Sequence, residues 1–460
     1  MLKNLLTIFL LSISIITIGN DFNVKKYGAI GDGVTDDAPA IQRAIDAAQV
    51  SGGCVFFPKG KYRVKKTLYV SGVSSADPKV NWITLRGCGI GSQLLGDGIN
   101  FILSGRPNVG SAKPWMNGSR IESLTFTSFD LKNRCNGIDM NLMLRVFIES
   151  CNFLRLKSAL SATMEFTPHK DPKKKQGHAI WIVRINKCVL SHNSDIAINL
   201  RRAFDVVISN NIIEDGNGGI QIGFIEDAKD SAACTLRIEN NVIEGLKSKG
   251  NPAIRLCCVV GGRIMGNYFE ANPSGDIEII PGKGGWVRGF VISSNTFQPT
   301  KKQREGEYGP IWVEKAFDLT INNNFTSGPR LIHPKSKQLG RNVVVFGNAI
   351  NNPPSIGNLD GVTAEERKKY ERIETSNTLN RNRLVLGGKT GHIGIDTNKG
   401  IVFGKNTISY GDGPTKKGNI GDIVFCRKPV VKNGKLIIGW YCVNGGNTAR
   451  WLPFSVNAEE

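Results

Sequence analysis

The chain has 460 residues, with 59 Lys and Arg against 39 Asp and Glu, which gives a formal net charge of +20. A stacked-repeat architecture can reach this length without the single globular core that limits ordinary domains. The excess of positive charge favours a polyanionic partner. We find no recognisable nucleic-acid-binding module and no clustered aromatic residues for base stacking, so an acidic glycan is favoured over nucleic acid.

The first twenty residues predict a secretory signal peptide. Met1-Leu2-Lys3 precedes an apolar run from Leu5 to Ile18, and that length and charged flank are typical of such peptides. The run is too short to predict a transmembrane span, so we expect no stable membrane span in the mature protein. The expected location is therefore secreted or at the cell surface, with an N-terminal strand or anchor segment as the alternative for residues 1–20.

Residues 22–64 predict a strand, a Gly/Asp turn, an amphipathic helix and a second strand. Ile41, Ile45 and Ala48 share one face of the helix, and either Thr35 or Asp36 is the expected N-cap. A helix in front of a repeat array is suited to covering the open end of a solenoid.

This N-terminal segment resembles the signature of the pectate-lyase superfamily. The resemblance is carried by the runs Tyr27-Gly28-Ala29-Ile30-Gly31-Asp32-Gly33-Val34-Thr35-Asp36-Asp37 and Cys54-Val55-Phe56-Phe57-Pro58. It implies an all-β fold, a right-handed parallel β-helix with an N-terminal capping helix. Members of the superfamily include polygalacturonase-like hydrolases, alginate epimerases and phage tailspikes, so the motif says much about the fold and little about the reaction.

A short phrase recurs between residues 120 and 350: an aliphatic residue, two free positions, Asn or Cys, one free position and an apolar residue. Its key positions are Leu124, Cys151, Cys188, Asn211, Asn241, Asn267, Asn295, Asn324 and Asn348, spaced 23 to 37 residues apart. Such a period indicates stacked repeats, and the alternating β-branched residues indicate strands. We predict that the Asn amides form a hydrogen-bonded ladder between coils, the alternative being that Asn only marks turns. We expect the β-helix to cover residues 21–350.

Ten cysteines raise the question of disulfides or zinc. Cys151 and Cys188 stand at ladder positions, where a small buried hydrophobe fits, and no Cys/His spacing suggests a zinc site. Cys426 and Cys442 are the one pair for which we consider a bridge.

The triplets expected to follow the ladder predict a column of outward side chains at coil spacing. That column contains Ala197, Gln221, Arg255, Glu278 and Trp312, with Asp195, Asp276 and Glu314 flanking it and Asn199 nearby. Neighbouring carboxylates can serve as acid and base in glycoside cleavage, so Asp195, Asp276, Glu278 and Glu314 are the candidate catalytic residues. Gln221, Arg255 and Trp312 are candidate substrate-binding residues, Arg255 for a sugar carboxylate and Trp312 for a pyranose face. The alternative is a solvated face with an ordinary Arg255–Glu278 ion pair.

Two further features could bind ligands. Glu214, Glu244 and Glu270 form a second expected column, where a Ca²⁺ site is an option although we predict no metal and no other cofactor. The long insertion between Cys151 and Cys188 is basic and carries His169, Lys170 and His178, which are candidate substrate-binding residues. A mobile charged loop is the alternative for that insertion.

Two patterns within the superfamily match only in part. Thr167-Pro168-His169 resembles the Asp-Pro-His of alginate epimerases but lacks the Asp. The polygalacturonase pattern keeps Asp195 of its paired-Asp turn, but the stretch 216–223, where its Gly-His-Gly turn should stand, has no His. This departure argues against that hydrolytic mechanism.

After residue 350 the pattern breaks. Residues 351–380 are predicted to be a linker, and residues 381–460 a small β-rich module. The module resembles the C-terminal tip of phage tail fibres through runs such as Gly439-Trp440-Tyr441-Cys442-Val443, which implies oligomerisation or glycan attachment. The tailspike resemblance leaves open a homotrimer and a location in a virion.

Three functions remain. The first is an enzyme, a polysaccharide lyase, glycoside hydrolase or epimerase that acts on an acidic polysaccharide; the second is a non-catalytic glycan-binding tailspike or adhesin; the third is a purely structural surface protein. The first is favoured because several carboxylates, an Arg and a Trp are expected on one exposed face.

Overall fold

The protein is described by a computed structural model. It describes residues 21–71, 82–106, 116–141, 143–163, 166–167, 176–177, 180–224, 233–282, 287–304, 308–333, 336 and 343–350, and the strands between residues 386 and 457. The predicted signal peptide, the predicted linker and the loop residues His169, Lys170 and His178 lie outside this part of the chain.

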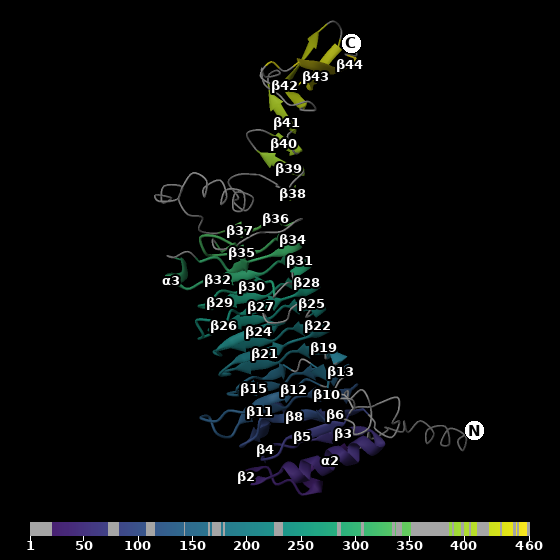
Figure 1. Ribbon diagram of the computed structural model, residues 1–460, viewed down its shortest axis with the longest axis vertical. Helices are drawn as coiled ribbons and strands as arrows, with labels where there is room; N and C mark the ends of the chain where they lie inside the picture. Colours follow the sequence, from purple (N-terminus) through teal and green to yellow (C-terminus); the bar gives the residue numbers. More distant parts are fainter. Residues whose placement is uncertain are drawn as a thin grey trace, which may run out of the picture.

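The described chain from residue 21 to residue 350 is a right-handed parallel β-helix, as predicted. From β3 to β33, each coil contributes one strand to each of three sheets, which run along the axis of the solenoid (Figure 1).

The strands of the three sheets, in their order along the axis, are as follows. Sheet A contains β1 (Asp21–Asn23), β3 (Gly53–Phe56), β6 (Ile83–Arg86), β10 (Arg120–Glu122), β14 (Phe147–Glu149), β19 (Ile180–Asn186), β22 (Ala203–Ser209), β25 (Ala233–Glu239), β28 (Val259–Met265), β31 (Val287–Ser293), β34 (Ala316–Asn322) and β36 (Val344–Phe346), with β9 (Met116–Asn117) and β13 (Met143–Leu144) beside it. Sheet B contains β2 (Asp32–Asp36), β4 (Gly60–Val64), β7 (Ser92–Gly96), β11 (Thr125–Ser128), β15 (Asn152–Leu154), β20 (Val189–Ser191), β23 (Ile212–Glu214), β26 (Val242–Glu244), β29 (Tyr268–Glu270), β32 (Thr296–Gln298), β35 (Phe325–Thr326) and β37 (Ala349–Ile350). Sheet C contains β5 (Leu68–Ser71), β8 (Phe101–Arg106), β12 (Asn136–Asp139), β16 (Leu160–Ala162), β21 (Ile196–Leu200), β24 (Gly218–Ile222), β27 (Ile254–Cys257), β30 (Ile277–Ile280) and β33 (Ile311–Val313).

Short elements lie between these strands. They are the 3-10 helices η1 (Val24–Tyr27) and η2 (Gly89–Gly91), the helix α3 (Lys301–Arg304), and the antiparallel strands β17 (Phe166–Thr167) and β18 (Gln176–Gly177) of the long insertion. Among the described residues, none of the helices has the length and apolar character needed to cross a bilayer.

Helix α2 (Ala38–Ser51) lies at the N-terminal end of the solenoid (Figure 1). Ile41, Ile45 and Ala48 are fully buried, as the amphipathic pattern predicts. The predicted cap is wrong by one residue, because Asp37 occupies the N-cap position and makes no capping hydrogen bond. The Asp37 carboxylate instead accepts from the backbone N–H groups of Ile30 and Gly31, at 2.6 and 3.0 Å, and so fixes the preceding turn.

The Asn ladder is confirmed. From Asn211 to Asn324, each side-chain amide donates to the side-chain oxygen of the next ladder residue at 2.9–3.0 Å, and Asn348 is the last acceptor. Each amide also donates to a main-chain carbonyl of the preceding coil, so the buried turns are satisfied in both directions. The residue just before every ladder position has a left-handed backbone, namely Ser123, Ser150, Lys187, Asn210, Asn240, Gly266, Ser294, Asn323 and Gly347.

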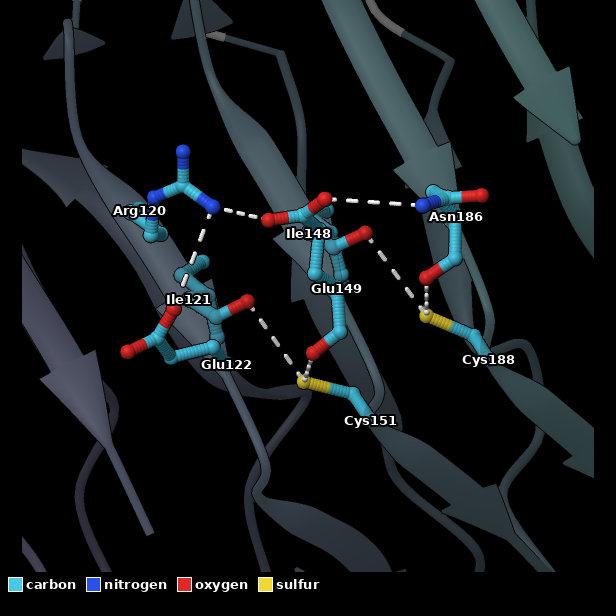
Figure 2. Close-up of polar contacts among 8 residues, drawn as sticks. All are labelled: Arg120, Ile121, Glu122, Ile148, Glu149, Cys151, Asn186 and Cys188. Carbon is cyan, nitrogen blue, oxygen red and sulfur yellow. Dashed lines mark hydrogen bonds and ion pairs between the residues drawn. The ribbon is translucent and has the colours of Figure 1, made fainter.

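Two cysteines continue the ladder toward the N-terminus (Figure 2). The Cys151 thiol donates to the carbonyl of Ile121, and the Cys188 thiol donates to the carbonyl of Ile148, at 3.6 and 3.7 Å. Burial raises the pKa of the Cys151 thiol well above its usual value, which keeps the donor proton in place. The prediction that both cysteines serve packing is therefore confirmed.

The interior is filled by stacks of like side chains from successive coils. The rings of Phe126 and Phe153 stack at 5.0 Å, as do those of Phe269 and Phe297, between columns of buried Ile, Leu and Val. Because every coil repeats this pattern, the outward side chains are set by the same register.

Past residue 385, the described strands form a separate sheet. They are β38 (Leu386–Gly388), β39 (Gly391–Asp396), β40 (Gly400–Phe403), β41 (Asn406–Gly411), β42 (Ile423–Lys432), β43 (Lys435–Asn444) and β44 (Arg450–Asn457). In this sheet Phe425 stands opposite Gly439 and Ile423 opposite Tyr441. The backbone of Cys426 is therefore displaced along the strands from that of Cys442, and this register does not favour the bridge we considered.

Candidate functional site

The outward face of sheet C carries one continuous column of polar and aromatic side chains. The register of successive strands aligns Tyr69, Ser104, Asp139, Ser161, Asn199, Gln221, Arg255, Glu278 and Trp312. Four of the five predicted members are therefore in the column. A strand of sheet B stands between each ladder turn and these triplets, so the triplets do not follow the ladder turn directly as the sequence pattern predicts.

The predicted place of Ala197 in this column is wrong. It is only 1% exposed, and Asn199, two residues later, stands beside Gln221. The run Ile196-Ala197-Ile198-Asn199-Leu200 contains two overlapping apolar triplets, and a shift by two residues preserves the alternation of faces. The sequence pattern could not choose between them.

Arg255 and Glu278 form an ion pair across adjacent coils. The Arg255 Nε–H donates to Glu278, and Nη2 donates to the carbonyl of Gly250 at 2.8 Å. The two side chains are only 17% and 13% exposed, so the pair is shielded from water more than a surface salt bridge is. These contacts occupy two of the five guanidinium N–H groups, and the others can face a ligand anion.

Trp312 ends the column. Its ring stacks on His333 with centroids 5.5 Å apart and planes 22° apart. Within the described part of the chain, the buried Nε1 of Trp312 and the buried Oδ1 of Asn199 have no hydrogen-bond partner. Unpaired buried polar atoms are rare in folded proteins, and two of them stand in this column.

Asp276 does not lie on this face. It is buried and accepts hydrogen bonds from Asn272 Nδ2 at 2.8 Å and from the Tyr308 hydroxyl. Burial raises the pKa of the Asp276 carboxyl to about 7, although both hydrogen bonds oppose that rise. The predicted outward position is wrong because β30 starts at Ile277, and the turn before it does not continue the alternation.

The other candidate carboxylates lie at unequal distances from one another. Asp195 precedes β21, three coils before Glu278, which is about 14 Å at the usual coil spacing. Glu314 follows β33 and stands two residues past Trp312, the neighbour of Glu278, at a backbone separation of roughly 8 Å. Among Asp195, Glu278 and Glu314, the last two are therefore the pair whose backbones are close enough for their carboxyl groups to flank one glycosidic bond.

The second predicted column is present on sheet B. Glu214, Glu244, Glu270 and Gln298 stand side by side. Burial and then the charges of Glu270 and Glu214 raise the pKa of Glu244. Among the described residues, no three His, Cys, Asp or Glu side chains are grouped so that they could hold a metal ion.

A depression of about 520 Å³ lies on sheet B and was not predicted. It is lined in part by Phe129, Arg155 and His192. The clue in the sequence is the insertion Phe129-Asp130-Leu131, which puts two large apolar residues in a polar loop, but nothing in the repeat indicates what they face.

Comparisons with known proteins agree with the fold. The family model described as Rhamnogalacturonase A/epimerase, pectate lyase-like, matches residues 22–223. The chain is 43% identical to Mannuronan C5-epimerase AlgE6 of Azotobacter vinelandii over 82 residues, which are 16% of this chain and 8% of that protein. It is 30% identical to Plasmin and fibronectin-binding protein A of Streptococcus pneumoniae over 434 residues, 84% of this chain and 57% of that protein.

Among solved structures, the tailspike protein of Acinetobacter baumannii phage AM24 matches with a TM-score of 0.58 and 19% identity. The match covers 75% of this chain and 55% of the tailspike chain, and at this identity it speaks for the fold alone. The chain spans less than a tenth of the AlgE6 epimerase and little more than half of the streptococcal protein.

Proposed function

We propose that this protein binds an acidic polysaccharide along sheet C and cleaves or modifies it, because residues 22–223 match the family model described as Rhamnogalacturonase A/epimerase, pectate lyase-like. The observation that carries the proposal is the column Asn199, Gln221, Arg255, Glu278 and Trp312 on one outward face. The proposed location is extracellular, in keeping with the plasmin and fibronectin-binding protein among the similar proteins, or in a virion.

In the proposed complex, a sugar ring lies against Trp312 and a uronate carboxylate meets the remaining N–H groups of Arg255. Neutralising that carboxylate makes the neighbouring C5 proton more acidic. In a lyase, removal of this proton and cleavage of the C4–O bond give a C4=C5 double bond, and the leaving oxygen takes up a proton to become a hydroxyl group. In an epimerase, a proton instead returns to C5 from the opposite face of the ring, which gives the epimer. In a hydrolase, water is added across the glycosidic bond.

Glu278 and Glu314 are the proposed proton-transfer pair, since their coils are adjacent. Asp195 lies too far away to pair with either, and Asp276 is buried in hydrogen bonds of its own. His169, Lys170 and His178 of the insertion remain proposed contacts for the anionic chain; the described strands that flank the insertion are β16 of sheet C and β19 of sheet A.

Replacing Trp312 by Ala is expected to weaken polysaccharide binding about tenfold or more, because a large ring in a shielded position contributes most of the contact energy. Trp181→Ala is the matched control, since Trp181 stacks on Phe204 at 4.9 Å on sheet A. Binding to polygalacturonate, mannuronan and guluronan, measured by calorimetry, reports the effect. Equal losses in both variants would contradict the placement on sheet C.

Replacing Glu278 or Glu314 by Gln is expected to lower product formation about 100-fold or more, because each variant loses a proton-transfer group. Glu239→Gln is the control, since Glu239 forms the same cross-coil pair with Arg263 on sheet A. New reducing ends, absorbance of unsaturated products and NMR of the recovered polymer report hydrolysis, elimination and epimerisation.

The second candidate function is binding without chemistry, as in an adhesin or tailspike. It is favoured by the 84% of this chain that aligns with the streptococcal plasmin and fibronectin-binding protein. If the wild-type protein binds uronate polymers and none of the three readouts changes, the catalytic part of the proposal is wrong and this second function stands.

A further inference from the structure

The depression on sheet B is a groove separate from the sheet C face. Its floor is made by outward side chains of β7, β11, β15 and β20, where the register aligns Leu95, Thr127, Leu154 and Ser191. Sheets B and C are different faces of the same solenoid, so no residue of the sheet C column lines this groove. Its volume of about 520 Å³ falls in the range typical of small-molecule sites.

One wall of the groove is the loop between β11 and β12. Phe129 and Leu131 on this loop are 43% and 48% exposed, which is unusual for side chains of their size. The Arg63 guanidinium lies 4.0 Å from the centre of the Phe129 ring, and Asp97 holds Arg63 at 2.7 Å. The ring is therefore held in place before any ligand arrives, which reduces the entropic cost of binding.

Hydrogen bonds also fix the rest of this loop. Arg134 Nη1 donates to the carbonyl of His192 at 2.6 Å, which ties the loop to the opposite wall. The Asp130 carboxylate accepts from the backbone of Lys132 and from the Asn133 side chain, both at 2.8 Å. A loop with two exposed apolar residues and this many fixed contacts is suited to presenting them to a ligand.

The opposite wall is cationic. Arg155 and His192 occupy equivalent turn positions of adjacent coils, both with left-handed backbones. Within the described part of the chain, the exposed Arg155 guanidinium has no carboxylate partner. His192 is engaged, with Nδ1 2.6 Å from Ser191 Oγ and Nε2 3.8 Å from Asp215. The two nearby acids are also engaged, Asp97 by Arg63 and Asp215 by Lys247 at 3.5 Å, so Arg155 supplies the uncompensated charge.

We propose that this groove is a second carbohydrate site, which binds a carboxylate-bearing pyranose with its ring against Phe129 and its carboxylate at Arg155. An aromatic ring, a free guanidinium and the polar side chains of Gln93 and Thr127 in one open groove match the face, the acid and the hydroxyl groups of a uronate. The choice of a uronate rests on the proposed function, whereas the groove itself does not. A second site on a different face lets one protein hold a polymer at two points, which raises its apparent affinity.

The test uses the full chain and short probes, trigalacturonate and trimannuronate, with maltotriose as the neutral probe. In a Trp312→Ala background, which removes the sheet C contact, residual uronate binding measured by calorimetry is expected to persist. Adding Phe129→Ala or Arg155→Asn is expected to weaken that residual binding about tenfold or more. Asn is chosen because it tolerates the left-handed backbone of Arg155, and Lys187→Asn, at a turn with the same backbone (φ 55° against 56°), is the matched control.

The outcomes separate the two sites. Loss of all binding in Trp312→Ala alone leaves the sheet C proposal intact and overturns the groove. Residual binding that neither Phe129→Ala nor Arg155→Asn reduces also overturns the groove. Binding that survives Trp312→Ala unchanged but fails in the groove variants supports the groove and contradicts the sheet C site. Binding of maltotriose as tight as that of the uronates would overturn the role of Arg155.

Discussion

Replacing Asn267 by Ala is expected to destabilise the β-helix by about 3–5 kcal/mol, because several buried polar groups lose their partners together. The Asn267 side-chain oxygen accepts from both the backbone N–H and the amide of Asn241, each at 2.9 Å. Its own amide donates to the carbonyl of Ile238 at 2.9 Å and to Asn295 at 3.0 Å. No water can replace a side chain that is 1% exposed without opening the turn.

Replacing Asn267 by Cys is expected to cost less, since the N-terminal coils already use cysteine at this position. A thiol can still donate to the carbonyl of the coil below, as Cys188 does to Ile148. It cannot accept two hydrogen bonds from Asn241 with the strength of an amide oxygen, so some loss remains.

Urea unfolding of the full chain, followed by circular dichroism, measures both effects, with Asn186→Ala as the control. Asn186 is half-buried at an outward position of sheet A, where water can take over its contacts, and we expect a loss of less than about 1 kcal/mol there. Equal midpoints for Asn267→Ala and Asn186→Ala would show that the ladder does not stabilise the solenoid.

The ladder was predictable from sequence because it depends on local pattern. One residue in each coil has to satisfy the same turn, and the period repeats over nine key positions. The same pattern aligned Gln221, Arg255, Glu278 and Trp312, since each stands in a single Ile-x-Ile, Ile-x-Leu or Ile-x-Val triplet. Two overlapping triplets fit the sequence of β21, so the pattern does not indicate whether Asn199 or Ala197 stands in the column.

Contacts between distant parts of the chain could not be predicted in this way. Asp276 looked like an outward acid, but it is enclosed by Tyr308, 32 residues later in the chain. The groove on sheet B depends on Arg63 reaching the Phe129 ring and on Arg134 reaching His192, contacts that no repeat encodes. The sequence likewise placed the helix N-cap at Thr35 or Asp36, before Asp37. The Asp37 carboxylate accepts from the backbone N–H groups of Ile30 and Gly31, a contact with an earlier turn that the helix pattern does not indicate.

The buried carboxyl of Asp276 leads to the second large expected effect, a loss of stability as pH rises. Its pKa is about 7 in the folded protein against an ordinary value of 3.8, because burial disfavours the charged form. The neutral acid is therefore preferred by the folded state. Its stabilising contribution is complete below pH 3.8 and is lost progressively as the pH rises through about 7, by roughly 4 kcal/mol at most.

Replacing Asp276 by Asn is expected to remove this pH dependence, because the amide is of the same size and never ionises. The unfolding free energies of wild type and Asp276→Asn are measured in urea from pH 4 to pH 8. As the pH rises, the wild type should lose several kcal/mol of stability relative to the variant. Asp195→Asn is the control for the substitution itself, since Asp195 is only half-buried and its carboxylate accepts from the backbone N–H of Ile196.

Tyr308→Phe tests the cause of the shift. The Tyr308 hydroxyl lowers the pKa of Asp276 by donating to the carboxylate, so its removal should raise that pKa further and move the loss of stability to higher pH. Parallel pH profiles for wild type and Asp276→Asn would instead mean that Asp276 is ionised throughout. The hydrogen bonds from Tyr308 and Asn272 would then offset the unfavourable burial of its charge.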